Sequence, residues 1–143
     1  MTIEEIAKLM VTKGKGILAA DESTGTMGKR LKSVNIESNE KNRLHFRETL
    51  FTSDSMKTSI SGVILYDETI RQTSSKGVLI PELIKKSGSI PGIKVDKGAK
   101  LLAGSDDEKI TEGLDGLRER MEEYYKLGAR FAKWRAVYSI SSK

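Results

Sequence analysis

The sequence predicts an α/β fold in which parallel strands alternate with helices. Apolar residues at helical spacing alternate along the 143-residue chain with short apolar runs, and this alternation is typical of strand, helix, strand units. The run Val63, Ile64, Leu65 is continuous, as in a strand that is buried on both faces. Because parallel strands need long crossover connections, the intervening helices indicate a parallel sheet wrapped by helices.

The first elements are a helix, a strand and a short helix. Thr2 followed by Glu5 forms a capping box, which begins a helix over residues 3–12. Residues 17–20 carry no polar side chain and are expected to form a buried strand. A short helix over residues 27–34 follows.

The middle of the chain contains two further helices around a second strand. Asn39 is a good N-cap for a helix that continues to residue 50 or 51. The second strand covers residues 62–66 and is followed by acidic residues. Pro81 at the first position of a helix and Gly88 at its end match the usual asymmetry of helix termini.

The last part of the chain adds two strands and one helix. The third strand, residues 92–97, alternates so that Lys94 and Asp96 share a face. Residues 98–112 show no periodicity and predict a surface loop. A helix that ends at Gly128 then has apolar residues at helical spacing, namely Leu114, Leu117, Met121, Tyr124 and Leu127. The fourth strand is predicted over residues 129–138.

Composition places the whole chain, residues 1–143, in one ordinary domain. The hydrophobic content of 37% supports a modest core. No apolar span or signal pattern marks the chain for a membrane or for secretion, so we expect a cytoplasmic protein. The absence of cysteine excludes disulfides, thiolate chemistry and cysteine-ligated zinc. The single histidine, His45, lies in a helical pattern without partners for a metal site.

The net charge of +5 comes from basic residues that are spread along the chain with acidic residues between them. This pattern does not favour binding to nucleic acid, which needs a basic run or patch. The excess charge serves either solubility or the local attraction of a small anion.

Asp21 is the first candidate functional residue. It follows a strand directly, and the carboxyl ends of parallel strands form the ligand crevice in α/β folds. Hydroxyl-bearing residues, glycines and the pair Lys29 and Arg30 come next, which is a suitable arrangement for a phosphorylated ligand. Alternatively, Asp21 simply caps the following helix.

Lys133 and Arg135 form the second candidate site. They lie two residues apart on the fourth strand, so their side chains point the same way. Burial of two like charges requires an anion or a carboxylate such as Asp21 nearby. The alternative is that this is a solvated edge strand.

Four segments of the sequence together closely resemble class I fructose-bisphosphate aldolase, and the match covers essentially every residue. These segments are residues 16–31, 62–69, 92–98 and 128–135. The resemblance implies a (βα)8 TIM barrel, of which about the first four βα units are present. It also implies the reversible cleavage of fructose 1,6-bisphosphate into two triose phosphates in glycolysis and gluconeogenesis. The reaction would proceed through a lysine imine, without a metal or other cofactor, in a protein that is a homotetramer at full length.

The resemblance also implies roles for particular residues. Asp21 matches an aspartate that acts in proton transfers around the imine. Lys133 matches a lysine that stabilises developing negative charge and helps to form the carbinolamine, and Arg135 matches an arginine that orients the charged groups.

Further residues match positions that bind the sugar phosphate. Ser23 and Thr26 match hydroxyl positions, although Thr26 replaces the usual serine, and Lys97 matches a lysine near the far phosphate. The remaining matches are Lys29, Arg30 and Arg43. For Lys29 and Arg43 a solvated helix surface is the alternative, whereas the guanidinium of Arg30 can bind phosphate bidentately.

One feature of the family is missing from these matches. The imine-forming lysine and the acid–base glutamate are implied to lie beyond the fourth strand, in sequence that this chain does not contain. We therefore expect the chain to be inactive alone. The alternatives are a non-catalytic fragment that binds a sugar phosphate and, less favoured by the dispersed charge, a protein that contacts nucleic acid or a scaffold.

Overall fold

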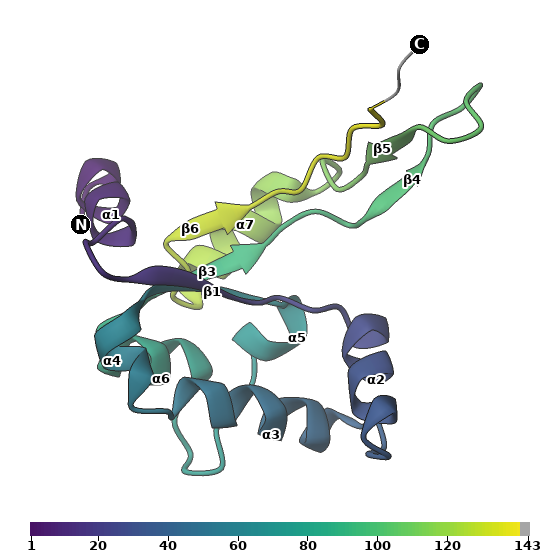
Figure 1. Cartoon of the computed structure of the whole chain (residues 1–143). Helices are drawn as coiled ribbons and strands as arrows, with labels where there is room; N and C mark the ends of the chain where they lie inside the picture. Colours follow the sequence, from purple (N-terminus) through teal and green to yellow (C-terminus); the bar gives the residue numbers. More distant parts are fainter. Residues whose placement is uncertain (141–143) are drawn as a thin grey trace.

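The computed structural model of the chain describes residues 1–140, in which helices surround a four-stranded sheet (Figure 1). The final residues of the predicted 1–143 domain, 141–143, lie outside this part. The strand order is β1-β2-β3-β6, and every neighbouring pair is parallel. The strands are Gly16–Ala20 (β1), Ile60–Leu65 (β2), Ile90–Lys94 (β3) and Phe131–Lys133 (β6). The predicted parallel α/β architecture is therefore confirmed.

The helices lie mainly between successive strands. They are Ile3–Met10 (α1), Thr24–Ser33 (α2), Glu40–Phe51 (α3), Ser55–Ser59 (α4), Asp67–Ile70 (α5), Ile80–Lys86 (α6) and Leu117–Lys126 (α7). In the view of Figure 1, α3, α4, α5 and α6 lie below β1, whereas α1 lies above it. The capping residues Thr2 and Asn39 both accept the expected backbone hydrogen bonds. None of the helices among residues 1–140 has the length and apolar character that a membrane span requires.

The hydrophobic core lies where β2 and β3 meet α6. Val63, Leu65 and Ile93 are buried in the sheet, and Ile80 and Ile84 of α6 are completely buried with them. Because β2 has a strand on each side and helices nearby, Val63 and Leu65 of its apolar run are buried as predicted, whereas Ile64 is only partly buried.

The prediction that the first strand is buried is wrong. Only Ala20 of β1 is buried, and the Ile17 side chain is 44% exposed. The physical reason is that β1 is an edge strand, paired only with β2 within the described sheet. An apolar run in the sequence predicts a buried strand only when neighbouring strands and helices cover that strand.

The fourth strand is much shorter than the predicted range 129–138. Its ladder with β3 ends at the pair Lys94 and Lys133. Beyond it, the backbone N–H of Arg135 donates to the Asp96 carboxylate at 3.3 Å, and Thr111 Oγ1 donates to the Arg135 carbonyl at 2.7 Å. Side chains thus replace the ladder, and the chain leaves the sheet.

Several other predicted boundaries also need correction. Residues 98–112 contain a hairpin of two short antiparallel strands, Ala99–Leu101 (β4) and Lys109–Thr111 (β5), instead of an irregular loop. Leu114 precedes α7 and is 73% exposed, so it does not belong to the buried face of that helix. The third strand begins and ends earlier than predicted, and α4 and α5 are too short to produce a periodic signal.

Candidate functional site

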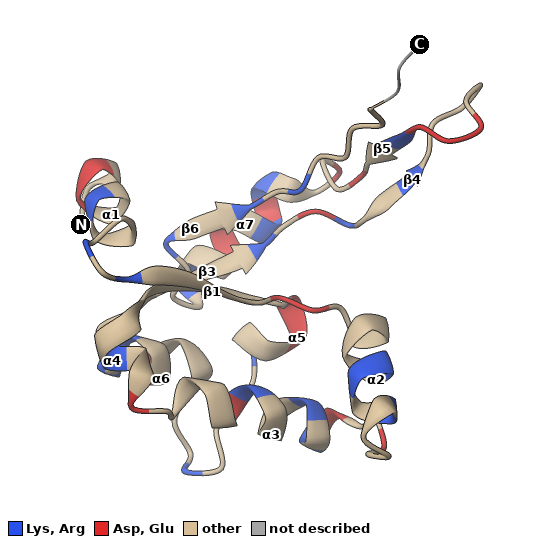
Figure 2. Cartoon of the chain, viewed as in Figure 1, with Lys and Arg blue, Asp and Glu red and all other residues tan. Residues whose placement is uncertain are grey.

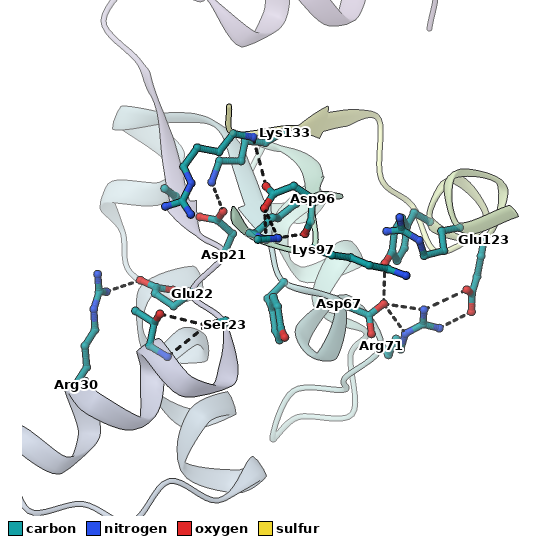
Figure 3. A pocket seen from close by; sticks show the side chains of 18 residues that line it. Asp21, Glu22, Ser23, Arg30, Asp67, Arg71, Asp96, Lys97, Glu123 and Lys133 are labelled. Carbon is teal, nitrogen blue, oxygen red and sulfur yellow. Dashed lines mark hydrogen bonds and ion pairs between the residues drawn. The ribbon is translucent and has the colours of Figure 1, made fainter. Parts of the chain in front are cut away.

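A pocket of about 840 Å³ lies at the carboxyl ends of the parallel strands (Figure 3). Eighteen residues line it, including side chains that directly follow β1, β2 and β3. This is the edge at which parallel α/β folds place their ligands, because the loops that follow the strands converge there. The side chains in the pocket come from segments that are far apart in the sequence.

A hydrogen-bonded ion pair in the pocket joins Asp21 to Lys133. Lys133 Nζ donates to Asp21 Oδ2 at 2.6 Å, although the two residues are 112 positions apart. The side chain of Asp21 is 11% exposed and that of Lys133 is 31% exposed. An ammonium and a carboxylate therefore stand together at the mouth of the sheet, where both can reach a bound molecule.

Asp96 lies close to the Asp21–Lys133 pair (Figure 3) and forms a second ion pair with Lys94. Lys94 Nζ lies 2.8 Å from Asp96 Oδ1, and the Asp96 carboxylate also accepts from the backbone N–H groups of Gly98 and Arg135. Burial would raise the pKa of Asp96, but these hydrogen bonds and the charge of Lys94 outweigh it and lower the pKa. Asp96 is therefore a fixed anion that orients the chain after β3.

The opposite rim of the pocket is an ion-pair network between α5 and α7. Arg71 pairs with Asp67 at 2.8 Å and with Glu123. The Tyr124 hydroxyl donates to Asp67 Oδ1 at 2.8 Å. Burial acts to raise the pKa of Asp67, but the hydrogen bonds from Arg71 and Tyr124 lower it overall. Since Arg71 is already neutralised by two carboxylates, it is a poor partner for a further anion.

The amino terminus of α2 forms the remaining wall. Ser23 is the N-cap, and its Oγ accepts from the backbone N–H of Thr26 at 3.3 Å. The first turn of this helix has no acidic residue, so the positive end of its dipole is available to an anion. Arg30 on the same helix pairs with Glu22.

The charges that line the pocket favour a negatively charged ligand. Seven lining residues are basic and five are acidic, so the basic residues exceed the acidic ones by two. Within residues 1–140, three basic lining residues have no ion-pair partner, namely Lys97, Arg120 and Arg135, although Arg120 donates to the backbone carbonyls of Val95 and Gly113. The whole chain has a net charge of +5, and both signs of charge are interleaved along it (Figure 2). What distinguishes the pocket is that seven cations surround one cavity, an arrangement that can attract a small anion.

The structure gathers seven of the nine residues singled out from the sequence into this pocket. They are Asp21, Ser23, Thr26, Arg30, Lys97, Lys133 and Arg135. Lys29 does not line it and is exposed on α2. Arg43 does not line it either, because α3 directs its side chain to Glu68, with an Nε to Oε2 distance of 2.9 Å, and to the Ser38 carbonyl.

Sequence reasoning did not single out Lys94, Asp96, Asp67 or Arg71 as site residues. The signal for Lys94 and Asp96 was present, because strand alternation placed them on one face next to a strand end. For Arg71 no such signal exists, since its position depends on how α5 and α7 approach each other in space.

Comparison with known proteins identifies the family. Residues 2–143 match the glycolytic family of class I fructose-bisphosphate aldolases. A probable class 1 fructose-bisphosphate aldolase of Xylella fastidiosa is 59% identical over 143 residues, which are 98% of this chain and 43% of the relative. The cytoplasmic isozyme 1 of Pisum sativum is 58% identical over 134 residues, covering 94% of this chain and 38% of the relative.

A solved structure agrees with the sequence comparison. Fructose-bisphosphate aldolase from Plasmodium falciparum, in a ternary complex with TRAP and a small-molecule inhibitor, is similar with a TM-score of 0.89 at 50% identity. The similarity covers 92% of this chain and 38% of the other. The chain thus spans 38–43% of the length of these relatives, and its parallel sheet corresponds to part of their barrel. The resemblance found in the sequence is confirmed: the chain belongs to the class I fructose-bisphosphate aldolase family.

Proposed function

We propose that this chain forms one wall of an active site that reversibly cleaves fructose 1,6-bisphosphate into glycerone phosphate and glyceraldehyde 3-phosphate. The observation that carries the proposal is the Asp21–Lys133 pair inside a pocket whose lining has an excess of positive charge. Family membership supplies the reaction class, and the pocket supplies groups that suit a phosphorylated sugar.

The proposed chemistry divides between Asp21 and Lys133. Cleavage breaks the bond between C3 and C4, the electron pair passes to a protonated imine at C2, and the C4 hydroxyl loses its proton to a base. Asp21 is a carboxylate that can exchange protons with a substrate hydroxyl. Lys133 Nζ, 2.6 Å from Asp21, can stabilise negative charge that develops on a neighbouring substrate oxygen.

The phosphate groups would be held by the basic and hydroxyl-bearing residues of the pocket. We assign one phosphate to the amino terminus of α2, where Ser23, Thr26 and Arg30 meet. Lys97 and Arg135 are available to the other charged groups. Lys29 and Arg43 do not line the pocket and have no part in these contacts.

We further propose that none of the pocket lysines forms the imine, so that the chain alone does not turn over substrate. Lys133 is paired with Asp21 and Lys94 with Asp96, and Lys97 is assigned above to the charged groups of the substrate, so each of these lysines already has another role. Incubation with fructose 1,6-bisphosphate and borohydride, followed by mass measurement, tests this directly. We expect an unchanged mass, and a stable adduct on any lysine would overturn the proposal.

Family membership also supports proposals about the assembly and the location of the protein. We propose that residues 1–143 are part of a single barrel domain that forms a homotetramer at full length. We also propose that it acts in the cytoplasm, because the relatives include a cytoplasmic isozyme of pea and a cytosolic aldolase of Arabidopsis thaliana.

Binding can be tested on this chain by calorimetric titration with fructose 1,6-bisphosphate. Arg30→Leu removes a cation that lines the pocket, whereas Lys32→Leu removes an exposed cation two residues later on the same helix. We expect Arg30→Leu to weaken binding by about tenfold, the effect of losing one charge-assisted hydrogen bond, and Lys32→Leu to change it by less than about twofold. Equal losses for the two variants would contradict a phosphate site on α2.

Binding of fructose 1,6-bisphosphate without turnover is expected of this chain alone under both candidate functions, of which the second is a non-catalytic module that holds a sugar phosphate. The basic residues that line the pocket support this alternative equally well. Strongly salt-dependent binding to a polynucleotide would instead indicate a nucleic-acid contact.

A further inference from the structure

Arg47 is a completely buried cation in the middle of α3, directly beneath the carboxyl end of β1. Its Nε donates to the Ala20 carbonyl at 3.2 Å, and a terminal nitrogen donates to the Glu22 carbonyl. The two accepting carbonyls bracket the segment that contains Asp21. The guanidinium does not line the pocket itself.

The hydrogen bonds from Arg47 begin where those of the sheet end. The ladder between β1 and β2 stops at the pair Ala20 and Leu65, so Asp21 lies just beyond it. A backbone segment without ladder partners can change its dihedral angles easily. Two bonds from one planar group, one on each side of this segment, restrict those changes and fix the direction of the Asp21 side chain.

The neighbours of Arg47 hold its guanidinium in place and connect it to the pocket through a series of contacts. Its terminal nitrogens lie 3.8 Å from carboxylate oxygens of both Glu22 and Glu68, which offset only part of the cost of burying its charge, since burial still lowers the pKa of Arg47. The ring of Tyr66 lies 5.9 Å from the guanidinium carbon. Glu22 also pairs with Arg30, so a continuous series of contacts joins Arg47 to a residue that lines the pocket.

We propose that Arg47 is a positioning residue, which aims the Asp21 carboxylate at Lys133 by holding the Ala20 and Glu22 carbonyls. This inference rests on the proposed function of Asp21 and Lys133. Arginine is required because a lysine ammonium is a single point donor and cannot reproduce a planar fork that reaches two carbonyls. A purely structural Arg47 would contribute to stability without affecting how strongly Asp21 and Lys133 interact.

A double-mutant cycle separates these two roles. Asp21→Asn, Lys133→Met and the double variant give the coupling between the two side chains from urea unfolding. We expect a coupling factor of about five in the otherwise unchanged chain, as for a partly exposed ion pair. With Arg47→Lys in the background, we expect the factor to fall below about two, because the carboxylate is no longer aimed at Lys133.

Arg130→Met is the control for Arg47→Lys, and the same double-mutant cycle is measured in its presence. Arg130 also donates to two backbone carbonyls, those of Tyr125 and Ala129, and also lies over an aromatic ring, but it does not touch residues 20–22. We expect this variant to leave the coupling unchanged. If Arg47→Lys destabilises the chain but leaves the coupling as large as before, Arg47 is only structural and the proposal is wrong.

A measurement on the unmutated chain covers the case in which Arg47→Lys does not fold. The Arg47 Nε–H should exchange with solvent at least about tenfold more slowly than that of Arg30, whose side chain is 55% exposed. Equal exchange rates would overturn the proposal. Neither experiment uses a substrate, so their outcome is independent of whether fructose 1,6-bisphosphate binds.

Discussion

Gly92 on β3 is the position at which one added carbon atom should disturb both the sheet and the site. A Cβ built on Gly92 would lie 2.3, 2.4 and 2.5 Å from three ring carbons of Phe131. Gly92 and Phe131 are paired across β3 and β6, and Lys133 lies two residues further along β6. Gly92→Ala therefore pushes on the strand that carries Lys133.

The size of the effect follows from these distances. Carbon atoms normally approach to about 3.5 Å, so the Phe131 ring must retreat by about 1 Å. Overpacking of this kind costs about 1–3 kcal/mol, and the restriction of the unfolded chain by alanine returns about 0.5–1 kcal/mol. Phe131 is only partly buried and can yield outward. We expect Gly92→Ala to lower the free energy of unfolding by about 1–2 kcal/mol.

Urea unfolding measures this change as a lower midpoint at an unchanged slope. Gly62→Ala is the matched control, because its Cβ would lie 3.2 Å from the same ring and requires a shift of only a few tenths of an ångström. Phe131→Leu should recover much of the loss when it is combined with Gly92→Ala. A Gly92→Ala variant that is at least as stable as the parent, or more stable than Gly62→Ala, would refute this reasoning.

Three further predictions concern charge and capping. The pKa of Glu68 is lowered, chiefly by its hydrogen bond with Arg43, so its contribution to stability is complete above the ordinary glutamate pKa of about 4.5 and is lost as the pH falls through the lower folded value. Glu68→Gln should therefore make the free energy of unfolding depend less on pH in that window, and an unchanged pH dependence would exclude this contribution. Lys133→Met removes an ion pair that is partly exposed, so it should cost only about 1 kcal/mol of stability but weaken the binding of fructose 1,6-bisphosphate, measured by calorimetry, by about tenfold or more. A loss of stability without a loss of affinity would show that Lys133 does not contact the ligand. Thr2→Ala removes the side-chain acceptor of the α1 capping box and should lower the free energy of unfolding, measured in urea, by about 1 kcal/mol. An unchanged free energy would mean that α1 does not unfold together with the rest of the chain.

The parts of the fold that sequence could predict are those in which local pattern and burial agree. The run Val63 to Leu65 predicted a central strand correctly because β2 has neighbours on both sides. Residues 17–20 look equally apolar, but whether a strand lies at the centre or the edge depends on the other strands. Likewise, Thr111 and Asp96 end β6 through contacts from distant parts of the chain.

The candidate site was most predictable where function-bearing residues lie on or next to a strand. Asp21 follows β1 and Lys133 is the last residue of β6, and the structure places them 2.6 Å apart. Arg47 and Arg43 look alike in the sequence, as basic residues on one helix, and the structure buries both, but Arg47 lies against the end of β1 whereas Arg43 pairs with Glu68. A charged residue in a helix is usually solvated, so only its position in three dimensions distinguishes these roles.

Fructose 1,6-bisphosphate should bind this chain in the pocket that contains Asp21 and Lys133. A titration followed by NMR, with the lysine Nζ and backbone amide groups labelled, measures the location without requiring turnover. We expect saturable shifts at Lys133 Nζ and at the amides of Ser23 and Thr26, which line the pocket, with none at β4 and β5. Shifts confined to that hairpin, or no shifts at millimolar ligand, would contradict the proposal that the Asp21–Lys133 pocket receives the sugar phosphate.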